Sequence, residues 1–148
     1  MNRAFTLIEL LLVISLMTII GSLSALAGSD TYQRALAAGD VERIVGALYR
    51  ARAMSQGNVC RIPPCAEPKS QGVHIEQELV SLFEGSEYEE DRVTESYPLS
   101  ARVVVTPTNI SFLPRKGAPI ADSIVTIRDA FGRERLITVT EAGVISFD

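Results

Sequence analysis

The chain begins with an apolar run, from Phe5 to about Ala27, that contains a single charged residue, Glu9. About 20 apolar residues suffice to carry one helix across the hydrocarbon core of a bilayer. A carboxylate in such a segment is costly, because an Asp, Lys or Arg at the bilayer centre costs about 2.5–3.5 kcal/mol on insertion scales. A purely structural anchor would gain by having Leu in place of Glu9. We therefore expect Glu9 to meet a positive partner in the working state of the protein.

A free amine is the physical candidate for that partner. If the chain is cut between Ala4 and Phe5, a new ammonium group lies four residues before Glu9, at the start of the same helix. Pairing within one chain requires strained geometry, whereas neighbouring chains displaced along a common axis can pair more naturally. Such pairs neutralise both charges in a low-dielectric setting and set the axial register of a helical bundle.

A short basic leader, Met1–Ala4, precedes the unbroken sequence Phe5-Thr6-Leu7-Ile8-Glu9-Leu10. This arrangement resembles the N-terminal methylation motif of the type IV pilin and type II secretion pseudopilin superfamily. The chain departs from the family pattern in having Ala4 where Gly is usual. It also has no proline before Pro63, although the family often has one near the end of the membrane segment.

The resemblance implies a structural subunit, a pilin or pseudopilin, of a type IV pilus or type II secretion pseudopilus. It implies cleavage between Ala4 and Phe5 by a prepilin peptidase, N-methylation at Phe5, and assembly through Phe5 and Glu9. The implied partners are other subunits in a helical fibre, the peptidase, the inner-membrane assembly platform, and membrane lipid before assembly. The implied location is the inner membrane, crossed once with the N-terminus in the cytoplasm and the head outside, and then the pilus or pseudopilus.

Two simpler interpretations compete for the same segment. The first is a secretory signal peptide that ends at Ala25-Leu26-Ala27, which would release a secreted binding domain. The charge of Glu9 and the length of the apolar run argue against it. The second is a plain single-span anchor, which leaves Glu9 unexplained.

The expected organisation has four parts: a leader (1–4), a transmembrane and assembly helix (5–28), an amphipathic helix that continues into the head (29–57), and an extracytoplasmic β-rich domain (58–148). Net charge at pH 7 is −4, which gives no support for a general nucleic-acid binder. Arg3, before the apolar run, favours a cytoplasmic N-terminus.

Apolar residues at helical spacing predict a helix that covers a sheet, from Asp30 to about Gln56. The stripe comprises Leu36, Val41, Ile44, Val45 and Leu48. The charged residues Arg34, Asp40, Glu42, Arg43, Arg50 and Arg52 are expected mostly on other faces. Gly57-Asn58 is the expected stop.

From Gly72 onward the pattern changes to short strands between turns, which predicts an α+β fold: a long N-terminal helix packed on a C-terminal antiparallel β-rich head. The expected strands are Val73–Ile75, Leu79–Phe83, Arg102–Thr106, Ile110–Leu113, Ile124–Arg128, Leu136–Thr140 and Val144–Phe147. Within the superfamily this arrangement most resembles the small minor subunits, the H-type pseudopilin or a minor pilin, whose last strand typically carries a glycine such as Gly143.

Cys60 and Cys65 are expected to form a disulfide that pins the connector between helix and sheet, because an exported protein folds in an oxidising compartment. A metal site would need additional ligands, and the single histidine is His74. We therefore predict no metal and no cofactor. A redox-active pair would prefer a Cys-x-x-Cys spacing.

Two charged regions suggest other functions. The acidic residues Glu76, Glu78, Glu84, Glu87, Glu89, Glu90 and Asp91 suit calcium by chemistry, but their spacing matches no defined loop, so a solvated surface loop is expected. Arg133 and Arg135 match a Gly-Arg-x-Arg pattern of DNA-binding minor pilins of competence systems. A DNA-uptake role is therefore retained as an alternative, although an exposed strand edge is favoured for these arginines. No catalytic constellation is present, which predicts that the protein is not an enzyme.

Overall fold

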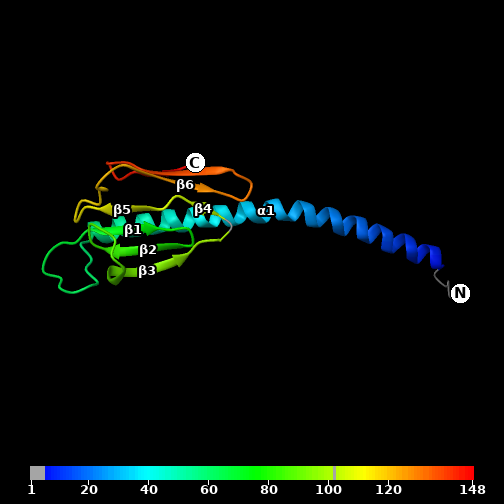
Figure 1. Ribbon diagram of the computed structural model, residues 1–148, viewed down its shortest axis with the longest axis horizontal. Coiled ribbons are helices and arrows are strands. Elements are labelled where there is room, and N and C mark those ends of the chain that lie inside the picture. The colour runs from blue at the N-terminus through cyan, green and yellow to red at the C-terminus, as the bar shows by residue number, and fades with distance from the viewer. Residues whose placement is uncertain (1–5, 102) are drawn as a thin grey trace. The chain divides into compact units, whose positions relative to one another are not determined.

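The structure is a computed structural model that describes residues 6–101 and 103–148, without the side chains of residues 23–30. The described residues form two helices and eight antiparallel strands in two sheets, which confirms the predicted α+β class (Figure 1). In chain order the elements are α1 (Leu7–Gln56), β1 (Gln71–Ile75), β2 (Leu79–Glu84), η1 (Glu90–Arg92), β3 (Val93–Pro98), β4 (Val104–Val105), β5 (Thr108–Phe112), β6 (Ser123–Arg128), β7 (Glu134–Val139) and β8 (Ile145–Phe147). The chain divides into two compact units, residues 1–35 and residues 36–148, and the second is called the head.

In the head, α1 buries one continuous face. The buried residues recur at the three- and four-residue spacing of an amphipathic helix, and they are Ala37, Asp40, Val41, Ile44, Val45, Ala47, Leu48, Ala51, Met54 and Ser55. The prediction that placed Asp40 on another face is wrong, because its side chain is fully buried within this stripe. Its carboxylate accepts hydrogen bonds from the Ser100 backbone N–H (3.1 Å) and from the Arg43 guanidinium (2.9 Å).

Helix α1 ends where the sequence predicts. Asn58 adopts a left-handed conformation (φ 50°), which Asn tolerates better than most residues. The Asn58 N–H then donates to the Ser55 carbonyl (3.2 Å), and the Val59 N–H donates to the Met54 carbonyl (2.9 Å). This pair of bonds is a Schellman motif, which satisfies carbonyls that the helix end leaves without partners.

The first sheet has the order β3-β2-β1-β5 and is antiparallel throughout. The predicted hairpin between β1 and β2 is present, with Val73 opposite Leu82 and Ile75 opposite Val80. Strand β3 was not predicted; it pairs with β2 across a register shift between Leu82 and Phe83.

The second sheet has the order β4-β6-β7-β8. The predicted pairing of β6 with β7 is present, with Val125 opposite Ile137. The two strands predicted on either side of the segment 106–109 belong to different sheets, because β4 pairs with β6 whereas β5 pairs with β1. The chain therefore crosses from one sheet to the other in that segment.

A single apolar core fills the head. It draws on α1 and on both sheets, whose strands run along the helix (Figure 1). Its buried members include Ile44 and Leu48 from the helix, Val73 and Phe112 from the first sheet, and Ile137 from the second.

The segment after β2 covers a second, smaller apolar cluster. Phe83 is fully buried but lies outside the main core. The Tyr88 ring meets Phe83 edge-on (5.6 Å between centroids) and stacks on His74 (3.7 Å). The expectation of a solvated acidic loop is therefore wrong in part, because this segment packs on the sheet and Glu84 lies buried at the end of β2.

Candidate functional site

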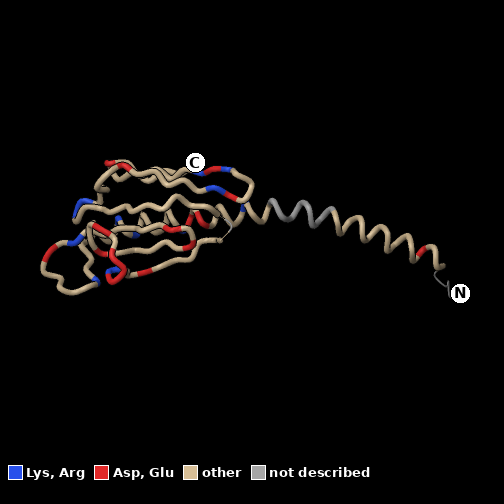
Figure 2. The backbone as a smooth tube through the Cα atoms, viewed as in Figure 1, with Lys and Arg blue, Asp and Glu red and all other residues tan. Residues whose placement is uncertain are grey.

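The N-terminal apolar segment, residues 6–22, exposes its side chains on every face of the helix. The exposed fraction of its large apolar side chains ranges from 45% at Val13 to 79% at Leu7. Glu9 is the single charged residue in this stretch, whereas acidic and basic residues are spread through the head (Figure 2). Because a helix that is apolar all round buries that surface against lipid or other helices, this segment is a candidate contact surface.

Glu9 lies in the first turn of α1. The Thr6 carbonyl accepts hydrogen bonds from the backbone N–H groups of Glu9 (3.0 Å) and Leu10 (3.3 Å), so the helix starts directly after Thr6. The first-turn position suits an anion, because the N-terminus of a helix carries partial positive charge. No side chain among the described residues pairs with the Glu9 carboxylate. The predicted cleavage site at Ala4 and the predicted methylation site at Phe5 lie outside the described residues.

The hydroxyl groups of the apolar segment are satisfied within the helix itself. Ser15 donates to the Leu11 carbonyl, Thr18 to the Ser15 carbonyl, and Ser22 to the Ile19 carbonyl, each at 2.8 Å. Such bonds let a hydroxyl lie in an apolar environment without a partner from outside. Among the described residues, no such hydrogen bond within the helix is present for the carboxylate of Glu9.

Among the residues that the structure describes, no helix combines the length and the hydropathy that crossing a membrane requires.

A disulfide joins Cys60 to Cys65, as predicted, with 5.7 Å between the two Cα atoms. The loop that it closes is held on the head by Glu84. This carboxylate accepts the backbone N–H groups of Arg61 (2.7 Å) and Ile62 (3.4 Å), and it lies 2.8 Å from the Lys69 ammonium. Burial raises the pKa of Glu84, but these three donors together hold the pKa below its ordinary value.

Glu95, on β3, connects three parts of the head. It pairs with Arg50 of α1 (2.6 Å) and with Arg61 of the disulfide loop, and it accepts the Tyr97 hydroxyl (2.6 Å). The hydrogen bond from Tyr97 lowers the pKa of Glu95 and raises the pKa of Tyr97; the two guanidinium groups lower the pKa of Glu95 further.

In the described part of the chain, no three metal-ligating side chains lie close enough to hold a metal ion.

The two arginines of the Gly-Arg-x-Arg pattern have different surroundings. Arg133 binds the buried Asp129 carboxylate (2.6 Å) and lies over the Phe131 ring, 5.2 Å from its centroid. Burial raises the pKa of Asp129, but the hydrogen bonds from Arg133 and from the Phe131 N–H bring the pKa below its ordinary value. Arg135 lies on β7, opposite Ile127; because β7 is an inner strand of its sheet, the prediction of a strand edge for these arginines is wrong. The structure therefore gives Arg133 a role in fixing the β6–β7 turn.

Sequence reasoning missed Asp40, the Glu84–Lys69 pair and Glu95 as structural groups.

No family model, curated protein or solved structure matches this chain.

Proposed function

We propose that the chain is a structural subunit of a type IV pilus or a type II secretion pseudopilus, cleaved after Ala4 and assembled through its N-terminal helix. The observation that carries this proposal is the match of Phe5–Leu10 to the family motif, together with a long helix that leaves its large apolar side chains exposed between Leu7 and Ile20. Before assembly the subunit is held in the inner membrane by that helix, with its head outside the cytoplasm.

The proposed mechanism of assembly is charge pairing between chains. Cleavage gives Phe5 a new amino group, and the carboxylate of Glu9 follows four residues later in the chain. In an α-helix, two groups four residues apart in the chain lie about 6 Å apart along the axis, because each residue rises 1.5 Å. A neighbouring subunit displaced along that axis can therefore place its Phe5 amine beside Glu9. The pair neutralises both charges and selects one register for the packed helices.

Within the superfamily, we propose a small minor subunit. The order of one long helix and then antiparallel strands supports this assignment. Gly143 lies in the turn before β8 and not in that last strand itself; its φ is 76°, and an added Cβ would lie 3.0 Å from the Gly117 carbonyl oxygen. A glycine is therefore required there on physical grounds.

The intact mass of the exported protein, collected from both the membrane fraction and the soluble secreted fraction, tests the proposal. A chain that begins with N-methylated Phe5 supports the pilin or pseudopilin class. A chain that begins at Gly28 identifies a secreted domain released by signal peptidase, and a chain that retains Met1 while assembling normally contradicts the pairing mechanism.

A further inference from the structure

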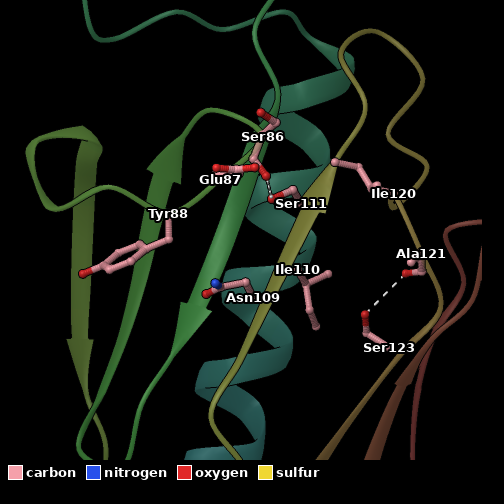
Figure 3. A pocket seen from close by; sticks show the side chains of 9 residues that line it. All are labelled: Ser86, Glu87, Tyr88, Asn109, Ile110, Ser111, Ile120, Ala121 and Ser123. Carbon is pink, nitrogen blue, oxygen red and sulfur yellow. Dashed lines mark hydrogen bonds between the residues drawn. The ribbon is translucent and has the colours of Figure 1, made fainter.

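A pocket of about 410 Å³ opens in the head between the two sheets (Figure 3). Its lining residues are Ser86, Glu87, Tyr88, Asn109, Ile110, Ser111, Ile120, Ala121 and Ser123. They come from the segment after β2, from β5, and from the chain that leads into β6. All of them lie in the head, so an inference from this pocket is independent of the proposed role of the N-terminal helix.

The chain closes this opening at both ends by backbone hydrogen bonds. At one end the Ile120 N–H donates to the Ser111 carbonyl (2.9 Å). At the other end the Thr106 N–H donates to the Thr126 carbonyl (3.0 Å). Between these bonds, no backbone hydrogen bond of the described chain joins residues 107–110 to residues 121–125. A complete extra strand therefore does not fit lengthwise, whereas a side chain or the tip of a bent segment can enter from outside.

The pocket has an unpaired strand edge on one side. Strand β5 is the last strand of its sheet. In an antiparallel ladder, residues alternate in the neighbour that their main-chain groups face. The Ser111 carbonyl faces away from β1, toward Ile120, so Asn109, two residues earlier, also turns its main-chain N–H and C=O away from β1. These groups give the pocket one backbone donor and one backbone acceptor, as in proteins that bind extended peptides at a sheet edge.

Aliphatic side chains line the pocket and its rim. Figure 3 shows Ile110 and Ile120 on the two sides of the opening. Ile120 is 54% exposed, whereas Ile110 is buried as part of the core of the head. A ligand that reaches beyond the cavity can therefore bury apolar surface against the rim.

The charge around the pocket is negative. Glu87 lines it, and its carboxylate has no ion-pair partner among the described residues. The pKa of the neighbouring Tyr88 hydroxyl is raised, first by burial and then by the carboxylates of Glu76 and Glu90. A cationic group is therefore the favoured partner.

The wall formed by the segment after β2 is fixed before any ligand binds. The Ser111 hydroxyl donates to the Ser86 carbonyl (3.0 Å), and Tyr88 is held by its stacking on His74. A preformed wall lowers the ordering cost of binding.

We propose that this pocket binds a short segment of another protein chain in which a Lys or Arg lies next to an aliphatic residue. The cation pairs with Glu87, the aliphatic side chain packs on Ile120, and the segment's backbone bonds to Asn109. The volume agrees with this ligand, since pockets for ligands of this scale measure about 300–1,000 Å³.

Nuclear magnetic resonance of the ¹⁵N-labelled full chain in detergent micelles tests the proposal with two synthetic peptides, Gly-Val-Lys-Ile-Gly and Gly-Val-Glu-Ile-Gly. We expect the lysine peptide to shift the amide signals of Asn109 and Ser111 saturably at concentrations up to about 5 mM, a weak-binding range. The glutamate peptide should bind at least tenfold more weakly. Glu87→Gln should weaken binding of the lysine peptide about two- to fivefold, as expected for an exposed ion pair.

Glu78→Gln is the matched control, because Glu78 is an exposed acid of the head that does not line the pocket. It should bind the lysine peptide as the unmodified chain does. The proposal is overturned if the lysine peptide gives no saturable shift, if both peptides bind equally, or if Glu87→Gln and Glu78→Gln behave alike.

Discussion

Replacing Glu84 with Gln removes one buried charge and keeps the shape of the side chain. Glu84 is fully buried at the end of β2, where it receives the Arg61 N–H (2.7 Å) and lies 2.8 Å from the Lys69 ammonium. The Gln variant leaves the ammonium without its counter-charge. Its amide can still accept the backbone N–H groups, but through a neutral oxygen. The disulfide loop is then held less firmly on the head.

The structure sets the expected size of this effect. Breaking a buried ion pair costs about 3–5 kcal/mol, and a single hydrogen bond to a charged group contributes about 1.5–3 kcal/mol. The Lys69 side chain remains 23% exposed, so water partly compensates its lost partner. We therefore expect Glu84→Gln to lower the free energy of unfolding by about 2–3 kcal/mol. For a domain of this size that corresponds to a decrease in Tm of about 10 °C.

Thermal unfolding of the full chain in detergent, followed by far-ultraviolet circular dichroism, measures this change, with Glu78→Gln as the control. The pH dependence supplies a second test. The pKa of Glu84 is lowered in the folded state, so its contribution is complete above the unfolded-state pKa, about 4.3, and is lost as pH falls through the lower folded value. The difference in stability between the unmodified chain and Glu84→Gln should therefore shrink below about pH 4. An unchanged Tm at pH 7, or a difference that stays constant down to pH 2, would refute the argument.

Three further predictions follow from the N-terminal motif and from the glycines of the head. Glu9→Ala should leave membrane insertion intact and impair incorporation into the fibre, measured as the ratio of sheared fibre to membrane-bound subunit; normal incorporation counts against the pairing mechanism. Ala4→Glu should block cleavage, and an unchanged mature mass would contradict the proposed processing site. Gly72→Ala should destabilise the head by about 1–3 kcal/mol, because an added Cβ would lie 2.2 Å from the Phe83 ring. Gly46→Ala should instead stabilise the helix by up to about 1 kcal/mol, because an added Cβ would meet no atom within 4 Å apart from the helix's own nearby backbone; equal Tm values for the two glycine variants would contradict this comparison.

Periodicity predicted the parts of the fold that bury one regular face. The stripe at Val41, Ile44 and Leu48 repeats at helical spacing, and the core of the head buries all three. The β6–β7 hairpin was predicted for the same reason, since Val125 and Ile127 alternate with exposed or half-exposed residues. Gly57-Asn58 ended the helix as expected because local turn chemistry fixes that end.

The sequence did not predict features that depend on partners far along the chain. Strand β3 has a half-exposed sequence with little alternation, and its pairing with β2 makes it a strand. The sequence pattern predicts a solvated Asp40, because its partner, the Ser100 N–H, lies 60 residues later. It predicts Glu84 in an acidic surface loop for a similar reason. A buried carboxylate and an exposed one look alike in a sequence until the donors that surround them are known.

The buried carboxylates of the head accept hydrogen bonds from groups of the same chain. Glu9 differs from them in this respect. In the head, Asp40, Glu84 and Asp129 each accept at least two hydrogen bonds from the same chain. In the N-terminal segment the hydroxyls bond to backbone carbonyls one turn earlier. Glu9 lies in that apolar segment, and no side chain of the described residues pairs with it. Under the proposed assembly mechanism, its partner comes from residues before Thr6, from lipid headgroups or from another chain. An amine at Phe5 of a neighbouring subunit is the candidate that also explains why the acid stands four residues after the proposed cut.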